Sequence, residues 1–331
     1  MSDAFRPVSP RIVPRFAGVS TFLRLPLHDD PKDVDCLIVG APFDGGTSFR
    51  PGARFGPRGV REASALTRAY HPDPGVDLFA HLRCADGGDV LCIPMDVTRT
   101  LANLAERARE IAEAKAIPAF VGGDHTCTLG VLRGLAAVHG PLGLIHFDAH
   151  SDTYGPAWDC DPHHGTVFRN AVEEGLVRAP DVIQIGLRGP YSTRDDLGFA
   201  RAHGFALVTS EDVHRGLDAV IARVKAMPAT GPYYVSFDVD AVDPSMAPGT
   251  GTPVPGGILS WQALALVRAT THLPVVGCDV MEVSPGLDLN GITSLLAANV
   301  LAETLAAVAA RRAGAVAVAG GGAEDRGRSP A

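Results

Sequence analysis

The sequence lacks several features of secreted and membrane proteins. Its six cysteines are scattered and form no CxxC pair, and residues 1–16 contain no apolar signal core. No run approaches the roughly 18 uninterrupted apolar residues of a membrane-spanning helix. Scattered cysteines in apolar segments are typical of reduced thiols in the cell interior. These absences predict a soluble, cytoplasmic protein that has no membrane partner.

Positive charge is also scarce. The 331 residues include 29 Lys and Arg against 37 Asp and Glu, a formal net charge of −8. Nucleic-acid binders depend on positive charge, so we expect no nucleic-acid partner. The negative charge mildly favours cationic small molecules, although it is equally ordinary for a soluble surface. With 46% hydrophobic residues, the chain is long enough to bury a sizeable core.

Short apolar runs alternate with helical patterns along the chain. The runs bounded by Gly, Pro or Asp are predicted strands: 35–40, 117–123, 142–148, 181–186, 205–210, 233–238 and 273–279. The predicted helices are 101–116, 210–226 with Ser210 as its cap, and 291–314. This alternation predicts one α/β domain with a mostly parallel sheet over residues 1–331. Its core would span about 35–314, with a loosely ordered arm (1–20) and tail (315–331).

Ionisable side chains follow three of these predicted strands. Two of the segments, HFDAHSD (146–152) and SFDVD (236–240), place them at alternate positions. Residues two apart in an extended chain point to the same side, and parallel strands bring their carboxyl ends to one ligand-binding edge. We therefore expect these side chains to converge. The six side chains are His125, Asp148, His150, Asp152, Asp238 and Asp240.

Four carboxylates in one pocket repel one another unless cations neutralise them. Oxygen and nitrogen ligands without thiolate favour Mn²⁺, with Zn²⁺, Co²⁺ or Ni²⁺ as substitutes. Two such ions can share one water and convert it to hydroxide near neutral pH. A DxD pair alone is common in loops, and GGDH alone would also suit a turn in which Asp124 caps a helix. The combination predicts a site for two Mn²⁺ ions per subunit.

Taken together, the motifs resemble the ureohydrolases, the arginase and agmatinase family. The resemblance covers about residues 35–310, and its Gly-rich segment 40–57 is typical of the agmatinase-like branch. It implies a three-layer α/β/α fold with a mostly parallel central sheet, a binuclear manganese site and a homotrimer or homohexamer. The motifs are GGDHT (122–126), DAHSD (148–152), HHGT (163–166), SFDVDAVDP (236–244) and DVMEVSP (279–285).

The resemblance also implies the roles of individual residues in hydrolysis of a guanidinium group to urea and an amine. His164 would shuttle protons to the leaving amine, and Glu282 would accept two parallel N–H bonds from the guanidinium. Without the resemblance, His164 would also suit a packing histidine and Glu282 a helix-start acid. His163 is expected to point away. Among the metal ligands, His125 and Asp152 would belong to one ion, His150 and Asp240 to the other, and Asp148 and Asp238 to both.

The segment TYGPAWDCDPH (153–163) is the predicted specificity loop. It lacks the Asn and small polar residues with which arginases read an α-amino acid, which argues against arginine. Asp159 and Asp161 could attract the ammonium of agmatine, and Trp158 could pack on its methylene chain. A solvent-facing acidic loop is an equally good interpretation. Agmatine, cleaved to urea and putrescine, is the favoured substrate.

Two alternatives remain. The motifs HHGT and QIGLRGP (184–190) also resemble branches that act on guanidino acids, such as 4-guanidinobutyrate, 3-guanidinopropionate or a proclavaminate-type substrate. Arg188 could bind their carboxylate if it faced the cleft. A catalytically silent homologue that binds a polyamine or a partner protein is disfavoured, because every ligand position, His164 and Glu282 are present. A phosphate-ester hydrolase is disfavoured because the sequence has no phosphate-cradling Gly-Lys loop.

Overall fold

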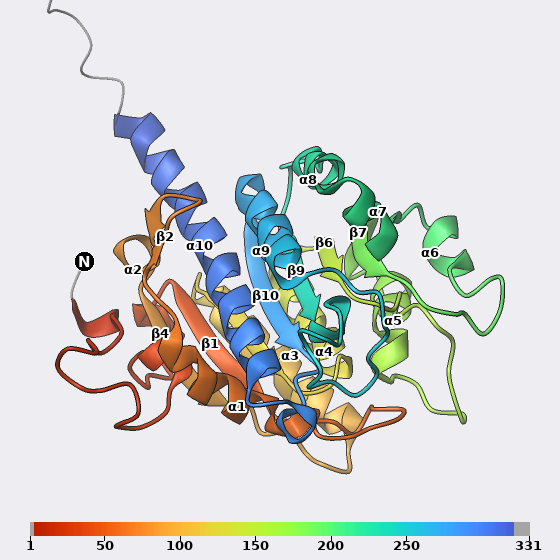
Figure 1. The fold of residues 1–331 in the computed structure, drawn as a ribbon, viewed down its shortest axis with the longest axis horizontal. Helices are drawn as coiled ribbons and strands as arrows, with labels where there is room; N and C mark the ends of the chain where they lie inside the picture. Colours follow the sequence, from red (N-terminus) through yellow and green to blue (C-terminus); the bar gives the residue numbers. More distant parts are fainter. Residues whose placement is uncertain (1–2, 321–331) are drawn as a thin grey trace, which may run out of the picture.

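A parallel sheet forms the centre of the protein (Figure 1). The computed structural model describes residues 3–320. The strands are β1 (Cys36–Ala41), β2 (Tyr70–His71), β3 (Val76–Asp77), β4 (Cys84–Asp89), β5 (Ile117–Gly122), β6 (Leu142–Phe147), β7 (Val177–Leu187), β8 (Ala206–Thr209), β9 (Tyr233–Asp238) and β10 (Val275–Met281). Eight of them pair in the order β4-β1-β5-β10-β9-β6-β7-β8, every neighbouring pair parallel, while β2 and β3 form a small antiparallel ribbon.

Helices cover both faces of this sheet, which confirms the α/β/α fold. They are α1 (Gly56–Ala63), α2 (Leu78–His81), α3 (Val97–Glu113), α4 (Thr126–His139), α5 (Val167–Glu173), α6 (Gly198–Ala202), α7 (Ser210–Arg215), α8 (Leu217–Lys225), α9 (Ser260–Arg268) and α10 (Ile292–Gly320). Helices α3 to α6 pack on one face and the others on the opposite face. Successive strand residues serve the two cores in turn: Leu37 belongs to one and Ile38 to the other.

All three predicted helices have different bounds from those expected. The segment 210–226 is not one helix, because Gly216 has φ −167° and ψ 73° and separates α7 from α8. The cap of α7 is Thr209 rather than Ser210, and its side chain forms a capping box with Asp212. Helix α3 begins at Val97, four residues before the expected start, because Asp96 accepts a hydrogen bond from the backbone of its first turn.

The edge strand β4 was not predicted. Its sequence, CADGGD, contains two glycines and two aspartates, residues that usually mark turns. Pairing with β1 and a buried carboxylate hold it in place: Asp86 accepts hydrogen bonds from Arg61 and from the backbone of Phe22. Tertiary contacts therefore outweigh the local preference of this segment.

Helix α10 continues six residues beyond the predicted end at 314, so part of the expected tail is helical. The rest of that tail, residues 321–331, lies outside the described residues. By length and composition, the stretch Ile292–Gly314 could cross a membrane, but 83% of its most apolar window is buried inside the protein. It therefore has the properties of a core helix, and it packs along the sheet beside α1 and α9 (Figure 1).

Candidate active site

Four central strands bring the predicted site residues to one edge of the sheet. The strands β5, β10, β9 and β6 are neighbours and run parallel, so their carboxyl ends lie side by side. The segment after β5 carries His125, and β6 is followed directly by Asp148. Gly123 is required in this turn, because a Cβ there would collide with the carbonyl oxygen of Phe43. The turn thus lets the chain pass close to a neighbouring loop before His125.

The first group of candidate metal ligands surrounds His125. Its Nδ1 lies 3.2 Å from Asp148 Oδ2, 3.1 Å from Asp152 Oδ2 and 3.3 Å from Asp238 Oδ2. All four side chains are buried. Asp152 has φ 50°, a conformation in the left-handed region that an aspartate tolerates at a cost. This turn directs its carboxylate to the group.

The second group surrounds His150 and shares Asp148 with the first. The Nδ1 of His150 lies 3.3 Å from Asp148 Oδ1 and 3.1 Å from Asp240 Oδ2. Asp238 adjoins this group, because its Oδ1 accepts a 2.8 Å hydrogen bond from the backbone of Asp240. The structure thus brings all six expected ligands together, with the two oxygens of Asp148 facing different histidines.

The closely packed carboxylates shift one another's pKa values. Burial, together with the nearby charges of Asp240 and Asp148, raises the pKa of Asp238 well above its usual range. Burial and Asp148 raise the pKa of Asp240 to about 6, although His150 opposes the change. Burial alone would lower the pKa of His125, but the carboxylates around it outweigh burial and raise it well above its usual range. Bound cations would relieve this crowding of negative charge.

The donor set fits divalent metal ions. His125 Nδ1 and Asp240 Oδ2 are buried and have no hydrogen-bond partner within residues 3–320. The ring of His125 is fixed from behind, since its Nε2 lies 2.8 Å from the hydroxyl of Ser236, which donates to the buried carboxylate of Asp279. The Nε2 proton therefore points to Ser236, and Nδ1, the nitrogen that would bind a metal ion, faces the carboxylates. Such an outer hydrogen bond is typical of histidines that bind metals.

His146 belongs to this centre, although it was not among the predicted residues. Its Nε2 lies 2.9 Å from Asp148 Oδ2, and its Nδ1 accepts a 3.0 Å hydrogen bond from the side-chain amide of Gln184. This amide makes Nε2 the protonated nitrogen, so His146 holds Asp148 by donating to it. The sequence contained a signal, because His146 stands two residues before Asp148 and points to the same side of β6. His146 was not predicted because it lies inside the apolar run LGLIHF, which was interpreted only as a buried strand.

His164 and Glu282 lie beside the cluster and contact each other. His164 Nδ1 is 3.1 Å from Glu282 Oε1, which also accepts a 3.0 Å hydrogen bond from the backbone of His125. On the other side of the ring, Nε2 lies 2.7 Å from the hydroxyl of Ser48. This hydroxyl can donate to the neutral ring or accept from the charged one, whereas the backbone N–H of Ser48, 3.2 Å from Nε2, favours the neutral ring. Burial alone would lower the pKa of His164, but Glu282 raises it to about 9.

A pocket of about 360 Å³ opens above the cluster. Its floor includes His150, Asp152 and Asp238, and its wall includes His164. Trp158 lines the pocket and is 79% exposed. The other lining residues are Ser48, Tyr154, Gly155, Ala157, His163, Gly165, Ser192 and Thr252.

The two acids of the specificity loop are placed differently from Trp158. Neither Asp159 nor Asp161 lines the pocket. The Asp161 carboxylate accepts 2.8 Å hydrogen bonds from the hydroxyl of Thr166 and the amide of Asn170, so it fixes the loop to α5. His163 does line the pocket, contrary to the expectation that it would point away.

Arg188 does not line the pocket either. Its guanidinium instead donates to the backbone around the cluster, and burial lowers its pKa. Every backbone group it contacts is a carbonyl, so the side chain ties the end of β7 to the segment after β9 and to the loop at Val254, and it is not available for a substrate carboxylate. The carbonyls belong to Gly186, Asp240, Ala241, Val242 and Val254.

A parallel α/β sheet with a buried His/Asp cluster and a pocket at its carboxyl edge has the features of a metal-dependent hydrolase. Residues 34–307 match the Arginase family, and the chain belongs to this family. The cluster is thus a candidate for a binuclear metal site. The comparisons confirm the resemblance that the motifs indicated, and the chain is an amidinohydrolase.

Individual relatives differ in the substrates that their names give. The chain is 44% identical to the mitochondrial guanidino acid hydrolase of Homo sapiens, over 93% of this chain and 88% of that one. It is 40% identical to an agmatinase of Salmonella paratyphi B, over 88% and 94% of the two chains. The chain matches the solved structure of proclavaminate amidinohydrolase from Streptomyces clavuligerus with a TM-score of 0.87 and 42% identity, over 90% of this chain and 99% of that one. These relatives leave the substrate undecided.

Proposed function

We propose that the protein hydrolyses a guanidino acid to urea and an amino acid. The lining of the pocket carries this proposal: apart from Asp152 and Asp238, which belong to the cluster, no described lining residue is acidic. The ammonium of agmatine would therefore meet no carboxylate of its own there. A substrate carboxylate would instead meet hydroxyl and imidazole groups, from Ser192, Thr252 and His163.

His163 has the features of a hydrogen-bond donor to that carboxylate. Its Nδ1 accepts a 3.1 Å hydrogen bond from the backbone of Gly165, which places the proton of the neutral ring on Nε2. Nε2 lies 3.4 Å from the carbonyl oxygen of Gly155, a long contact that a better acceptor would replace. Burial lowers the pKa of His163, so its ring is neutral at pH 7 and keeps this arrangement.

The reaction would use the cluster and the two residues beside it. Two divalent ions held by the six ligand side chains would make a shared water nucleophilic near neutral pH. Glu282 does not itself line the pocket, but it contacts His164, which does. It would orient the guanidinium through Oε2, which accepts no hydrogen bond among the described residues, while Oε1 holds His164. His164 would carry a proton to the departing amine, because its Nε2 faces the pocket next to Ser48.

The expected metal, assembly and location are part of the proposal. The nitrogen and oxygen donors without thiolate support Mn²⁺ as the metal, two ions per subunit. We propose a homotrimer or homohexamer on the family resemblance alone. A cytoplasmic location is in keeping with four buried, unpaired cysteines, since reduced thiols persist in a reducing compartment.

Agmatine is the second candidate, cleaved to urea and putrescine. Asp159 directly follows Trp158, which lines the pocket, and it is exposed to solvent. The net charge of −8 would also attract a dication at long range.

Urea release separates the two candidates. The Mn-loaded protein is incubated with 4-guanidinobutyrate, 3-guanidinopropionate, agmatine and arginine, and kcat/KM is measured for each. We expect the guanidino acids to have the higher kcat/KM. His163→Gln should reduce kcat/KM for the guanidino acids about tenfold and change kcat/KM for agmatine little. Asp159→Asn is the matched control and should leave guanidino acids unchanged. Preference for agmatine, reduced by Asp159→Asn, would refute the guanidino-acid assignment in favour of agmatine.

A further inference from the structure

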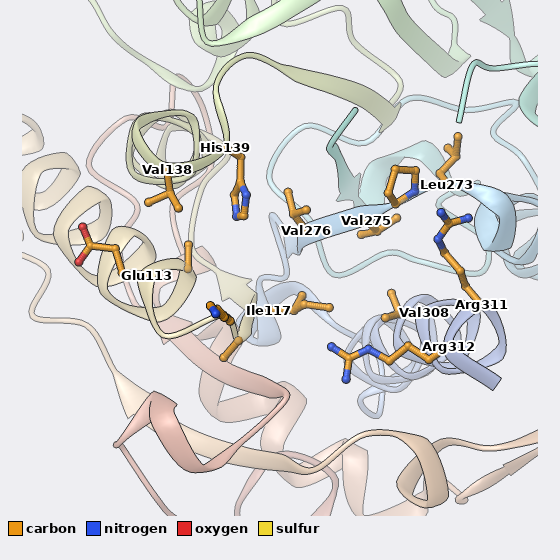
Figure 2. A pocket seen from close by; sticks show the side chains of 14 residues that line it. Glu113, Ile117, Val138, His139, Leu273, Val275, Val276, Val308, Arg311 and Arg312 are labelled. Atoms are coloured by element: carbon orange, nitrogen blue, oxygen red, sulfur yellow. The ribbon is translucent and has the colours of Figure 1, made fainter. Parts of the chain in front are cut away.

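A second and larger pocket lies at the opposite edge of the sheet. It has a volume of about 540 Å³ and is formed by the start of β5, the start of β10, and helices α3, α4 and α10 (Figure 2). Ile117 and Val275, the first residues of their strands, line it. Because β5 is six residues long, the pocket lies roughly 20 Å from the His/Asp cluster. The reaction described above makes no use of it.

The walls of this pocket are mostly apolar. Pockets that bind small molecules are typically of this size, apolar, and provided with a few polar groups. Val276 points toward the cavity, and Val308 of α10 lies opposite the α4 side (Figure 2). The apolar lining residues are Ala112, Ala116, Ile117, Val138, Leu273, Pro274, Val275, Val276 and Val308.

The charged lining residues are mainly cationic. Arg311 donates a hydrogen bond to the carbonyl oxygen of His272 but forms no ion pair with a described carboxylate. Lys115, which follows α3, likewise forms no ion pair with a described carboxylate. The one acid of the lining, Glu113, is paired with Arg109 at 2.6 Å. Figure 2 shows the Glu113 carboxylate on the opposite side of the cavity from Arg311.

Arg312 adds a third cation that is only partly neutralised. Its Nη1 lies 3.2 Å from Asp35 Oδ1. The same carboxylate forms a 3.0 Å ion pair with Arg83, so a single negative charge serves two guanidinium groups. The arginine side of the pocket therefore has an excess of positive charge, although the protein as a whole has a formal net charge of −8.

From this arrangement we propose that the pocket binds a small apolar anion, a carboxylic acid with an aromatic or acyl body. The apolar walls would cover the body, and Arg311, with Arg312 beside it, would receive the carboxylate through charge-assisted hydrogen bonds. Aromatic and acyl acids share this chemistry.

Calorimetric titration of the Mn-loaded protein with 2-naphthoate and with decanoate tests the proposal. Neutral 2-naphthamide, which has the same shape as 2-naphthoate, controls for the charge. We expect at least one acid to bind with one molecule per subunit, and 2-naphthamide to bind at least about tenfold more weakly than 2-naphthoate if that acid binds. Binding of 2-naphthoate alone would identify an aromatic ligand, and binding of decanoate alone an acyl chain.

Variants locate the binding. Val276→Trp should obstruct the pocket and strongly weaken binding, and Arg311→Gln should weaken it about tenfold. Arg215→Gln removes an arginine of α7 that lies outside the pocket and should change nothing. Urea release by each variant confirms that it is folded. The proposal is refuted if neither acid binds, if 2-naphthoate binds but 2-naphthamide binds equally well, or if the folded Val276→Trp protein binds like the wild type.

Discussion

The contact between His164 and Glu282 yields a prediction that does not depend on bound metal. In the metal-free protein, Glu282 raises the pKa of His164 from 6.5 to about 9 although burial opposes the change. A difference of this size corresponds to about 3 kcal/mol in favour of the charged ring. Replacing Glu282 with Gln keeps the shape of the side chain and removes its charge. Burial then dominates, and we expect the pKa of His164 to fall to about 6.5 or lower.

The measurement is an NMR titration of metal-free protein labelled with ¹⁵N-histidine. The chain contains 12 histidines, so His164→Gln is used to assign the signal. Glu174→Gln is a matched control, since Glu174 is paired with Arg133 and does not contact His164. Circular dichroism establishes that each variant is folded. The reasoning is wrong if the wild-type ring titrates between about pH 6 and 7, or if Glu282→Gln leaves its pKa near 9.

Two further predictions concern metal binding and acid stability. His146→Asn should lower the Mn²⁺ affinity about 10- to 100-fold, because Asp148 loses the hydrogen bond that the His146 ring donates to it. Calorimetry after dialysis against a chelator measures this affinity, and an unchanged value would exclude this role of His146. His71 and Arg268 lower the pKa of Glu303 from 4.5 to about 2 against the effect of burial, so its stabilisation is present above pH 4.5 and is lost as the pH falls towards 2. In urea unfolding, the wild type should therefore lose about 3 kcal/mol more than Glu303→Gln between pH 7 and pH 2, and equal losses would contradict the assignment.

The sequence predicted the parts of the site that follow directly from strand ends. Asp148, His150 and Asp152 alternate after an apolar run, and a parallel sheet brings such segments together. The six expected ligands do converge in the structure. Their roles as ligands remain predictions, as do those of His164 and Glu282.

Residues that act through distant contacts were harder to predict. Ser48 reaches His164 across 116 positions of sequence, and no local pattern marks it. Asp161 looked like a substrate ligand because it stands in the loop before His164, yet its partners are Thr166 and Asn170. The direction of a loop side chain depends on which donors lie near it, and the sequence does not contain that information.

The prediction of secondary structure was wrong where tertiary contacts overrode the local conformational preference of a segment. Strand β4 has the composition of a turn, but pairing with β1 and the contacts of Asp86 keep it extended. Gly216 interrupts a segment that otherwise has continuous helical character. Both differences involve glycine or aspartate, for which several backbone conformations have similar energy.

The position of α10 in the chain has a consequence for how the protein is made. This helix follows every strand of the sheet, and its apolar residues, such as Leu301 and Leu305, complete one of the two cores. During synthesis, the sheet can form while that face still lacks its cover. The nascent chain then presents an open apolar surface that can bind chaperones or aggregate until α10 emerges.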